Sequence, residues 1–344
     1  MIAPNGVLEG AVRVSGGAIS MVASRPPRRS RAIDVGGRLI APGFIDLHVW
    51  GDPERLAREL PAQGTTAFLI GIGPEPPKVF RARRRVTGPP SGARCLGAHC
   101  EGPFLSPARP GTLPARWMRR PAGADLNAMA RLGARIVTLA PERPGALEAI
   151  RWLRRRRIVV SLGHSDADAE TAERAAAAGA RAVTHVFNGM RPFHHRAPGL
   201  IDAALADPRL TAMVIADGHH VSASALALLL RQKGWRGTAL VTDSVRAVQQ
   251  AWRLTFNGGV YRDARGVLAG SALAMMRAVR NAVELGGASV EDAVRMAAET
   301  PARLLGETRR GAIAPGRRAD LVVLDERLRV CLTIIGGEAV YGGV

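Results

Sequence analysis

The sequence predicts an α/β protein, and three observations support that fold class. Eight short apolar runs rich in β-branched residues recur through the middle of the 344-residue chain, and amphipathic stretches of helical period lie between them. The two ends of the chain contain only short strand-like segments. The hydrophobic content of 47% is that of an ordinary globular protein. Alternating strands and helices favour a parallel sheet, and eight such units make a TIM-type (β/α)8 barrel the economical arrangement.

The first and last segments of the chain are expected to form a small β-sandwich outside the barrel. Residues 7–22 alternate apolar and polar side chains between glycine turns, and a basic, proline-rich loop follows before a further strand near residues 38–40. The C-terminal segment contains three or four short strands without a helical stripe. Neither end is expected to close a core alone. We therefore predict one domain of residues 1–42 plus 311–344 and a barrel domain of residues 43–310.

The barrel strands are expected in eight runs. In chain order they begin near residues 43, 65, 95, 135, 158, 182, 212 and 239. Amphipathic helices are expected between them, for example over residues 166–180 and 222–235. Two more helices are expected near the end of the barrel, over residues 271–286 and 289–306.

The formal net charge of +19 would ordinarily point to nucleic acid as a partner. The excess is almost wholly arginine, since Lys78 and Lys233 are the only lysines, and it accompanies heavy use of Ala, Gly and Pro. The sharpest basic run, Arg154 to Arg157, ends an expected helix, and only seven Phe and two Tyr are available to stack on bases. We therefore expect solvated helix ends and no nucleic-acid partner. A few arginines would also suit an anionic substrate.

Cysteine usage and hydropathy bear on the location of the protein. Cys95, Cys100 and Cys331 form no CxxC pair, so we expect neither a disulfide framework nor a cysteine zinc cluster. No apolar run reaches the roughly 18 residues typical of a membrane span. The N-terminal segment lacks the basic start and apolar core of a secretory signal. We expect a cytoplasmic protein without a membrane partner.

Polar side chains collect at the ends of the predicted strands. In the run at 95–104, mostly apolar residues lead up to Glu101. If this carboxylate is buried, it needs a cation or hydrogen-bond partners. Two other runs end at His164 and near His185, and one Glu with two His would make a zinc-type site with an open position for water. Active sites of such barrels lie at the C-terminal ends of the strands, where these residues would converge. The other polar residues at strand ends are His48, Asn188, Asp217, His219, His220 and Asp243.

One metal ion is preferred to two on the residues available. Binuclear barrel hydrolases often bridge their ions with a carboxylated lysine at a strand end, and both lysines lie in predicted helices or flanking loops. The first strand reads His48-Val49-Trp50 where an HxH pair would be needed for a second ion. We predict one divalent ion per subunit, Zn²⁺ first and Fe²⁺, Co²⁺ or Mn²⁺ as alternatives. A second ion at His48 stays an open alternative.

The order and spacing of several motifs resemble the N-acetylglucosamine-6-phosphate deacetylase family of the amidohydrolase superfamily over nearly the whole chain. The matching motifs are APGFIDLH (41–48), LGAHCEGPFLS (96–106), GHSDA (163–167), THVFNGM with RAPGL (184–200), ADGHHV (216–221), VTDS (241–244), LAGSALAM (268–275) and TPARLLG (300–306). The tail GAIAPGRRADLVVLD resembles the closing motif of the superfamily.

The resemblance implies a metal held by Glu101, His164 and His185, with Asp243 as the catalytic acid/base. A bound zinc ion acidifies water and polarises the amide carbonyl, while a carboxylate takes a proton from the water and passes one to the departing amine. The implied reaction is hydrolysis of the acetamide of an N-acetyl amino-sugar phosphate. The simplest case converts N-acetylglucosamine 6-phosphate to glucosamine 6-phosphate and acetate.

The resemblance also implies substrate contacts and a partner. The implied substrate-binding residues are Thr112, Leu113, Asn188, Gly189, Asp217 and His220, with Leu268, Ala269 and Gly270 in a loop that closes on the sugar. It further implies a homodimer, in which Arg196 reaches the phosphate bound in the neighbouring subunit. The planar fork of arginine suits that task because it binds phosphate oxygens in pairs.

Three loops depart from the family pattern. Leu113 stands where the family commonly has a His that polarises the acetyl carbonyl, and losing such a donor costs on the order of a hundredfold in rate. Another histidine, at 194, 195 or 219, would have to replace it. Trp50 begins a rebuilt first loop, and VRAVQQAW follows Asp243 and Ser244. Two alternatives therefore stay open: an amidohydrolase acting on a different small amide or cyclic amide, and a non-catalytic binding relative.

Overall fold

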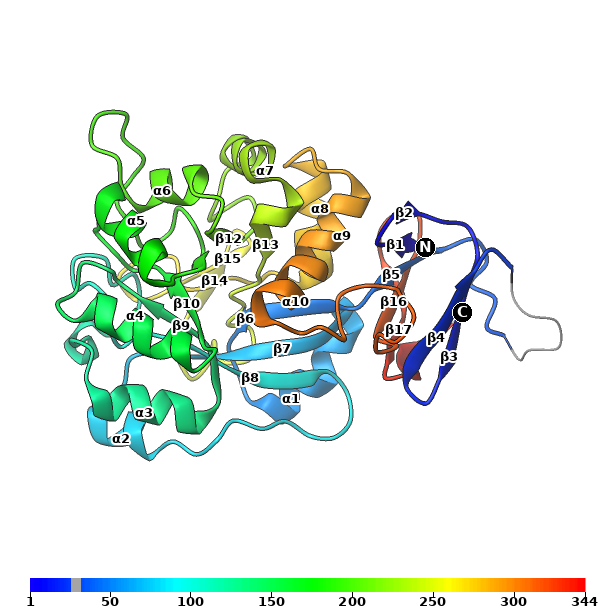
Figure 1. Ribbon diagram of the computed structural model, residues 1–344, viewed down its shortest axis with the longest axis horizontal. Coiled ribbons are helices and arrows are strands. Elements are labelled where there is room, and N and C mark those ends of the chain that lie inside the picture. Colours follow the sequence, from blue (N-terminus) through cyan, green and yellow to red (C-terminus); the bar gives the residue numbers. More distant parts are fainter. Residues whose placement is uncertain (26–31, 344) are drawn as a thin grey trace.

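Eight parallel strands form the central sheet of the computed structural model, which describes residues 1–25 and 32–343 (Figure 1). Neighbours in sequence are neighbours in the sheet throughout. The strands are β6 (Phe44–Val49), β7 (Thr65–Ile72), β8 (Arg94–Glu101), β9 (Ala134–Leu139), β10 (Val159–Leu162), β11 (Ala182–Val183), β12 (Thr211–Val214) and β13 (Thr238–Leu240). All eight predicted strands are present, and the α/β class is confirmed.

The first and last strands close the ring through the residues that follow β13. The backbone N–H of Asp243 donates to the carbonyl oxygen of His48 over 2.8 Å, and that of Trp50 donates to Ser244 over 2.9 Å. Below this junction, the buried carboxylate of Asp46 accepts from the backbone N–H and the hydroxyl of Thr242. The sheet is therefore a TIM-type barrel, as predicted. Its closure lies at the same level as the candidate site.

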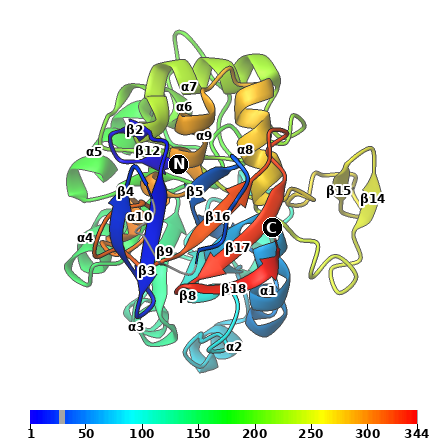
Figure 2. The ribbon, with the colours of Figure 1, turned by 90° about the vertical axis from the view of Figure 1, so that its right-hand side faces the viewer.

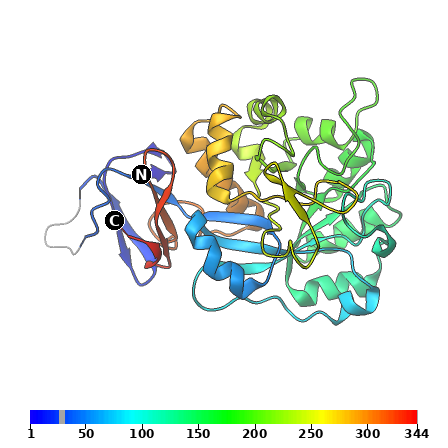
Figure 3. The ribbon, with the colours of Figure 1, turned by 180° about the vertical axis from the view of Figure 1, so that it is seen from behind.

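Helices cover the outside of the barrel (Figures 1 and 3). They are α1 (Pro53–Glu59), α2 (Pro77–Ala82), α3 (Gly123–Leu132), α4 (Ala146–Arg155), α5 (Ala169–Ala178), α6 (Leu200–Ala206), α7 (Ala223–Gly237), α8 (Met275–Glu284), α9 (Val290–Ala297) and α10 (Glu299–Leu305), with 3-10 turns at Leu60–Gln63 and Ala115–Trp117. The stretch expected as one helix over 289–306 is divided at Ala298. Pro301 has no N–H with which to continue the hydrogen-bond ladder of α9.

Strands from both ends of the chain form a small β unit beside the barrel (Figure 2). One antiparallel sheet combines β5 (Leu39–Pro42), β16 (Leu321–Leu324), β17 (Val330–Ile335) and β18 (Glu338–Gly342). The hairpins β1 (Ile2–Ala3) with β2 (Gly6–Val7) and β3 (Ala11–Ser15) with β4 (Ala18–Ala23) complete the unit.

A small apolar core joins the two ends of the chain. The buried side chains of Met1 and Ile19 pack with those of Ile313 and Leu321. The expected small β domain built from both termini is therefore present, because neither end has enough apolar side chains for a core of its own. Its bounds at 1–42, 311–344 and 43–310 stay a prediction. Residues 26–31, in the expected basic loop, lie outside the described residues.

A hairpin follows the last barrel strand and stands out from the body of the barrel (Figure 2). Its strands are β14 (Thr255–Asn257) and β15 (Val260–Arg262), which pair antiparallel. The guanidinium of Arg265, just after β15, donates to the carbonyl oxygen of Gly111 over 3.0 Å. This bond ties the hairpin to the loop after β8. In the part of the chain that the structure describes, no helix has the length and apolar character needed to span a membrane.

Candidate metal centre and active site

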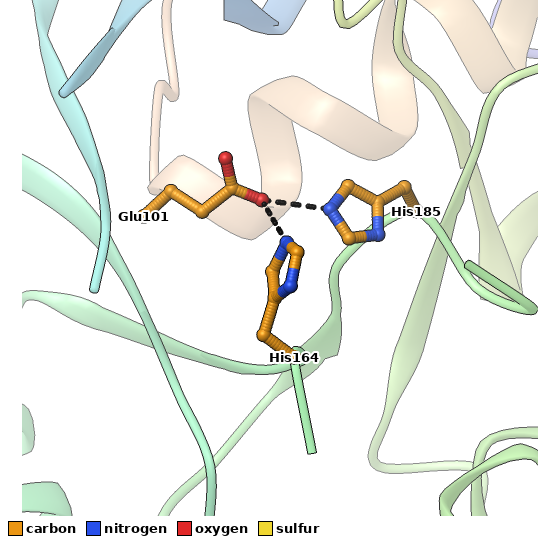
Figure 4. A group of neighbouring side chains, drawn as sticks. All are labelled: Glu101, His164 and His185. Atoms are coloured by element: carbon orange, nitrogen blue, oxygen red, sulfur yellow. Dashed lines mark hydrogen bonds and ion pairs between the residues drawn. The ribbon is translucent and has the colours of Figure 1, made fainter. Parts of the chain in front are cut away.

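Glu101, His164 and His185 meet at the C-terminal end of the barrel strands (Figure 4). Glu101 is the last residue of β8, and the two histidines follow β10 and β11. The Oε1 atom of Glu101 lies 3.0 Å from Nε2 of His164 and 2.7 Å from Nε2 of His185. One ligand atom from each residue lies within 4.8 Å of the others, and all three side chains are buried. The predicted ligand set is therefore assembled.

The hydrogen bond behind His164 tests whether this set suits a metal ion. Nδ1 of His164 lies 2.8 Å from the carbonyl oxygen of Arg109, which can only accept, so Nδ1 carries the proton. In the neutral form of the ring, which metal binding requires, Nε2 then carries the lone pair and faces the carboxylate of Glu101. Two acceptors face each other favourably only around a shared cation. Two imidazoles and a carboxylate without cysteine fit a catalytic divalent ion, zinc included.

Burial and charge shift the ionisation of these residues in opposite directions. Burial raises the pKa of Glu101, but the positive charge of His48 and His164 and hydrogen bonds from the histidines hold it well below its usual range. Burial lowers the pKa of His185, yet the hydrogen bond to Glu101 and that carboxylate's charge raise it to about 9. Glu101 is therefore ionised, and its negative charge is what a cation requires. A metal ion would take the place of the positive charge that the imidazoles supply to Glu101.

The backbone at this centre adopts uncommon conformations. His164, His185 and Asp243 have φ angles of 47°, 30° and 49°, in the left-handed region that side chains other than glycine rarely adopt. Each such residue costs on the order of 1–3 kcal/mol, and such residues cluster at functional sites. The reversed backbone ends β11 after two residues and turns the side chains inward at the barrel mouth. These three residues are therefore held in place at an energetic cost.

His48 lies on the floor of the site, in β6. Its side chain is buried, and Nε2 lies 3.3 Å from both Glu101 Oε2 and Asp243 Oδ1. Burial lowers the pKa of His48, but the two carboxylates outweigh it and raise the pKa. The ring of His99 packs against it with the centroids 4.2 Å apart. His48 thus connects Glu101 with Asp243.

Asp243 accepts a hydrogen bond that sequence analysis missed. The indole Nε1 of Trp50 donates to its Oδ1 over 2.8 Å. Trp50 was identified as a departure from the family pattern, but nothing in the sequence indicates which side chain an indole two residues after His48 contacts. Asp243 is therefore fixed from two sides, by Trp50 and His48.

A family model described as "Amidohydrolase family" matches residues 39–340. The chain belongs to the amidohydrolase family. An N-acetylgalactosamine-6-phosphate deacetylase of Escherichia coli O157:H7 is 36% identical, with 87% of each chain covered. An N-acetylglucosamine-6-phosphate deacetylase of Bacillus subtilis is 34% identical over 97% of this chain and 93% of that relative. A crystal structure of N-acetyl-D-glucosamine-6-phosphate deacetylase from Mycobacterium smegmatis superposes with a TM-score of 0.87 at 30% identity, covering 96% of this chain and 95% of that one.

The predicted resemblance to the N-acetylglucosamine-6-phosphate deacetylase family is confirmed by these comparisons. Amidohydrolases are metal-dependent hydrolases of amide C–N bonds, so this chain is an enzyme of that class. The geometry of the Glu101 centre agrees with that class, because it offers the ligand group that such an enzyme requires.

The centre of this amidohydrolase opens into a cavity of about 180 Å³. Most of the predicted substrate-binding residues line it, namely Thr112, Leu113, Asn188, Gly189, His220, Leu268 and Gly270. The predicted metal ligands and Asp243 line it as well. Gly111, Ile215, Val245, Trp252 and Val267 also line the cavity and were not predicted from the sequence. Gly189 has a φ of +63°, and a Cβ there would lie 3.0 Å from Nδ1 of His164. Because glycine has no Cβ, the His164 ring stays accessible from the cavity.

Three of the residues predicted to bind substrate do not line this cavity, and one of them, Arg196, was predicted to reach the neighbouring subunit's substrate. Asp217 stands behind His220, accepting from its Nδ1 over 2.6 Å and from its backbone N–H over 2.8 Å. Ala269 is buried and donates its backbone N–H to Tyr261. Arg196 is exposed on the loop after β11 and is not among the residues that line this cavity. Asp217 therefore orients His220, and Arg196 faces outward.

The histidines expected to compensate for Leu113 do not reach the cavity. His194 and His195 stack on each other in the exposed loop, and His219 lies beside Gly259 of the hairpin. The cavity histidine in this part of the enzyme is His220. A search for polar residues near strand ends could not separate it from its neighbour, because adjacent residues of a loop point in different directions. Arg109 escaped prediction because it acts through its backbone carbonyl, which any residue possesses.

Proposed function

We propose that this amidohydrolase removes the acetyl group from N-acetylglucosamine 6-phosphate, yielding glucosamine 6-phosphate and acetate. The observation that carries the proposal is the convergence of Glu101, His164 and His185 next to Asp243 at one cavity. The names of relatives at 34–38% identity support the substrate class. A catalytic role suits these residues better than a binding role, because a binding protein gains nothing from a strained ligand set beside an oriented carboxylate.

Glu101, His164 and His185 would hold the metal, for which zinc is the first choice. When bound, the ion supplies a Lewis acid that polarises the acetyl carbonyl and acidifies water. The surrounding residues orient the ligands and supply the negative charge. The carbonyl of Arg109 keeps Nε2 of His164 available as a ligand, and the Glu101 carboxylate supplies the negative charge.

Asp243 would act as the general base and then as the general acid. Its Oδ1 accepts from Trp50, which leaves Oδ2 as the oxygen that takes the proton from the attacking water. The same proton passes to the departing nitrogen, so the amine leaves neutral and the carboxylate is regenerated. Nε2 of His48 lies 3.3 Å from the same Oδ1 and contacts the carboxylate from the other side.

The cavity wall would bind the sugar through Thr112, Asn188 and His220, with Leu268 and Gly270 closing over it. We further propose a homodimer in which Arg196 reaches the phosphate of the neighbouring subunit's substrate, because this exposed arginine has no role in its own cavity. A cytoplasmic location is proposed as well, supported by the three free cysteines, which a reducing compartment preserves.

Two observations support second candidates. The relative in Escherichia coli is a deacetylase of N-acetylgalactosamine 6-phosphate, which differs only at one hydroxyl configuration. Leu113 lines the cavity where the family commonly places a histidine, and this favours a different small amide or cyclic amide. Both candidates use the same metal and base, so they are distinguished by substrate and not by site.

The test is release of free amine from N-acetylglucosamine 6-phosphate and N-acetylgalactosamine 6-phosphate by zinc-loaded enzyme, with Asp243→Asn as the control. Turnover of the glucosamine compound that falls about 10²- to 10⁴-fold in the variant would support the proposal. Faster turnover of the galactosamine compound would move the assignment to that sugar. Failure on both, with metal bound, would contradict deacetylation of either sugar phosphate.

A further inference from the structure

We propose that Trp50 is a positioning residue that holds Asp243 in its working orientation, and that the same indole hydrogen bond keeps a second ion from His48, in line with the single ion predicted from the sequence. The proposal rests on the function proposed above for Asp243. It concerns a residue that lies outside the set predicted to touch metal or substrate.

The backbone brings the two side chains together. Trp50 directly follows β6, and its N–H bonds to Ser244 while the N–H of Asp243 bonds to His48, so the two segments run in register across the barrel closure. The indole Nε1 then lies 2.8 Å from Oδ1 of Asp243. The same Oδ1 lies 3.3 Å from Nε2 of His48. One carboxylate oxygen thus faces both an indole N–H and an imidazole.

An indole N–H cannot serve a cation. It is a donor without a lone pair in the ring plane, whereas a metal ion needs an electron pair from every ligand. A second ion between His48 and Asp243 would have to displace the Trp50 hydrogen bond and would receive no ligand in return. An imidazole at position 50 would offer such a pair. The residue type at position 50 therefore decides whether Asp243 accepts a hydrogen bond on this side of the site or shares a second metal ion with His48.

The Trp50 ring is held so that it cannot easily move away. It is only 6% exposed, and a Cβ at Gly71 of β7 would lie 2.7 Å from the ring, so the glycine backbone forms its seat. Trp252 packs edge-on from the other side, with the ring centroids 4.9 Å apart. His48 contacts the ring in a second edge-on arrangement at 5.3 Å. Packing on three sides fixes the N–H direction, which is what orienting a carboxylate requires.

Orientation of the base affects the chemical step more than substrate affinity. With Oδ1 bound to Trp50, Oδ2 is directed to the reacting water, whereas a rotating carboxylate would present that oxygen for only part of the time. Misplacement of a catalytic group by about 1 Å can cost on the order of a hundredfold in rate. Removing the N–H should therefore lower kcat and leave KM nearly unchanged.

Metal counting tests the first half of the proposal without any substrate. Wild type, Trp50→Phe and Trp50→His are loaded with excess Zn²⁺, freed of loose metal and analysed by mass spectrometry of the elements. We expect one ion per chain in wild type and Trp50→Phe and two in Trp50→His. Two ions in wild type, or one ion in Trp50→His of unchanged secondary structure, would overturn the exclusion of the second ion. This result does not depend on the identity of the substrate.

Steady-state kinetics tests the second half. Trp50→Phe, which keeps an aromatic ring but lacks the N–H, should lose about ten- to a hundredfold in kcat with KM within about twofold of wild type. Trp152→Phe on α4, remote from the cavity, is the matched control and should retain wild-type values. An unchanged kcat in Trp50→Phe, or a change confined to KM, would overturn the positioning role. Inactivity of wild type on every substrate would count against the proposed function, while the metal counts would still decide the first half.

Discussion

Nδ1 of His164 donates to the carbonyl oxygen of Arg109 over 2.8 Å. Arg109 belongs to the loop after β8, which also brings Gly111, Thr112 and Leu113 to the cavity. The orientation of His164, a proposed metal ligand, therefore depends on the conformation of a loop that lines the cavity. Arg109 is itself tied to Asp166 by an ion pair of 2.8 Å. Arg109 therefore supports both the proposed metal centre and the cavity wall.

Glu101→Gln is expected to release most of the metal. The amide keeps the shape of the side chain but removes the negative charge that attracts the cation, and two histidines alone bind weakly. Since loss of a mere supporting hydrogen-bond partner costs ten- to a hundredfold in metal affinity, the fall should exceed about a hundredfold. Competition with a chelator measures it. Glu54→Gln, on the exposed surface of α1, should bind like wild type; equal affinity in Glu101→Gln would exclude this residue as a ligand.

Leu113→His is expected to raise kcat for N-acetylglucosamine 6-phosphate. Leu113 lines the cavity, and an imidazole there could donate to the acetyl carbonyl as its charge develops. A gain of about tenfold or more is expected where the donor is missing in wild type. Assay of both proteins at saturating substrate measures the effect. A lower rate would show that the cavity is built around an apolar side chain and would favour a different amide as substrate.

Asp217→Asn is expected to raise KM about tenfold with a smaller effect on kcat. The carboxylate accepts from Nδ1 of His220, and the amide would place a donor there and force the other tautomer of the ring. His220 would then offer the cavity a different polar group, at a cost comparable to one hydrogen bond to a charged residue. Initial-rate kinetics measures KM and kcat separately. An unchanged KM would mean that His220 does not contact the substrate.

The free energy of unfolding of Asp46→Asn is expected to increase relative to that of wild type as the pH rises from about 4 to 6. Burial raises the pKa of Asp46 from 3.8 to about 6, although hydrogen bonds from Thr242 lower it. The folded state therefore holds its proton more tightly, so wild type loses stability as the pH rises through this window. The loss amounts to at most about 3 kcal/mol.

Urea unfolding of both proteins between pH 4.5 and 7.5 measures this difference. Asn keeps an oxygen for Thr242 but does not ionise, so the stability difference should change with pH and level off above about 6. Asp34→Asn, at an exposed position, serves as the control for general effects of charge. A difference that is constant across the range would show that Asp46 ionises normally in the folded protein.

The sequence predicted the parts of the site that depend on strand ends. Glu101, His164 and His185 each follow an apolar run, and parallel strands must bring their C-terminal ends together. The same reasoning located Asp243. Periodicity predicted all eight strands for a similar reason, since a strand buried on both faces leaves an uninterrupted apolar run.

The parts that sequence reasoning could not provide depend on side-chain direction within loops. The Trp50 hydrogen bond crosses 193 residues of sequence, and no local pattern encodes it. The family resemblance named His220 and not His219, but the physical basis of that distinction is one turn of backbone, which Asp217 organises through both N–H groups. A residue that acts through its main chain, as Arg109 does, cannot be recognised from its amino-acid type.

The backbone bonds between His48 and Asp243 and between Trp50 and Ser244 also constrain how the enzyme matures. They join the first strand of the barrel to the segment after the last strand, so the Asp243 carboxylate reaches its place only when these two ends of the sheet have paired. An intermediate that has folded some of its βα units can bring Glu101, His164 and His185 together and still lack an oriented Asp243. Metal uptake could then precede activity during refolding, and the appearance of turnover would report the final joining of the two ends of the sheet.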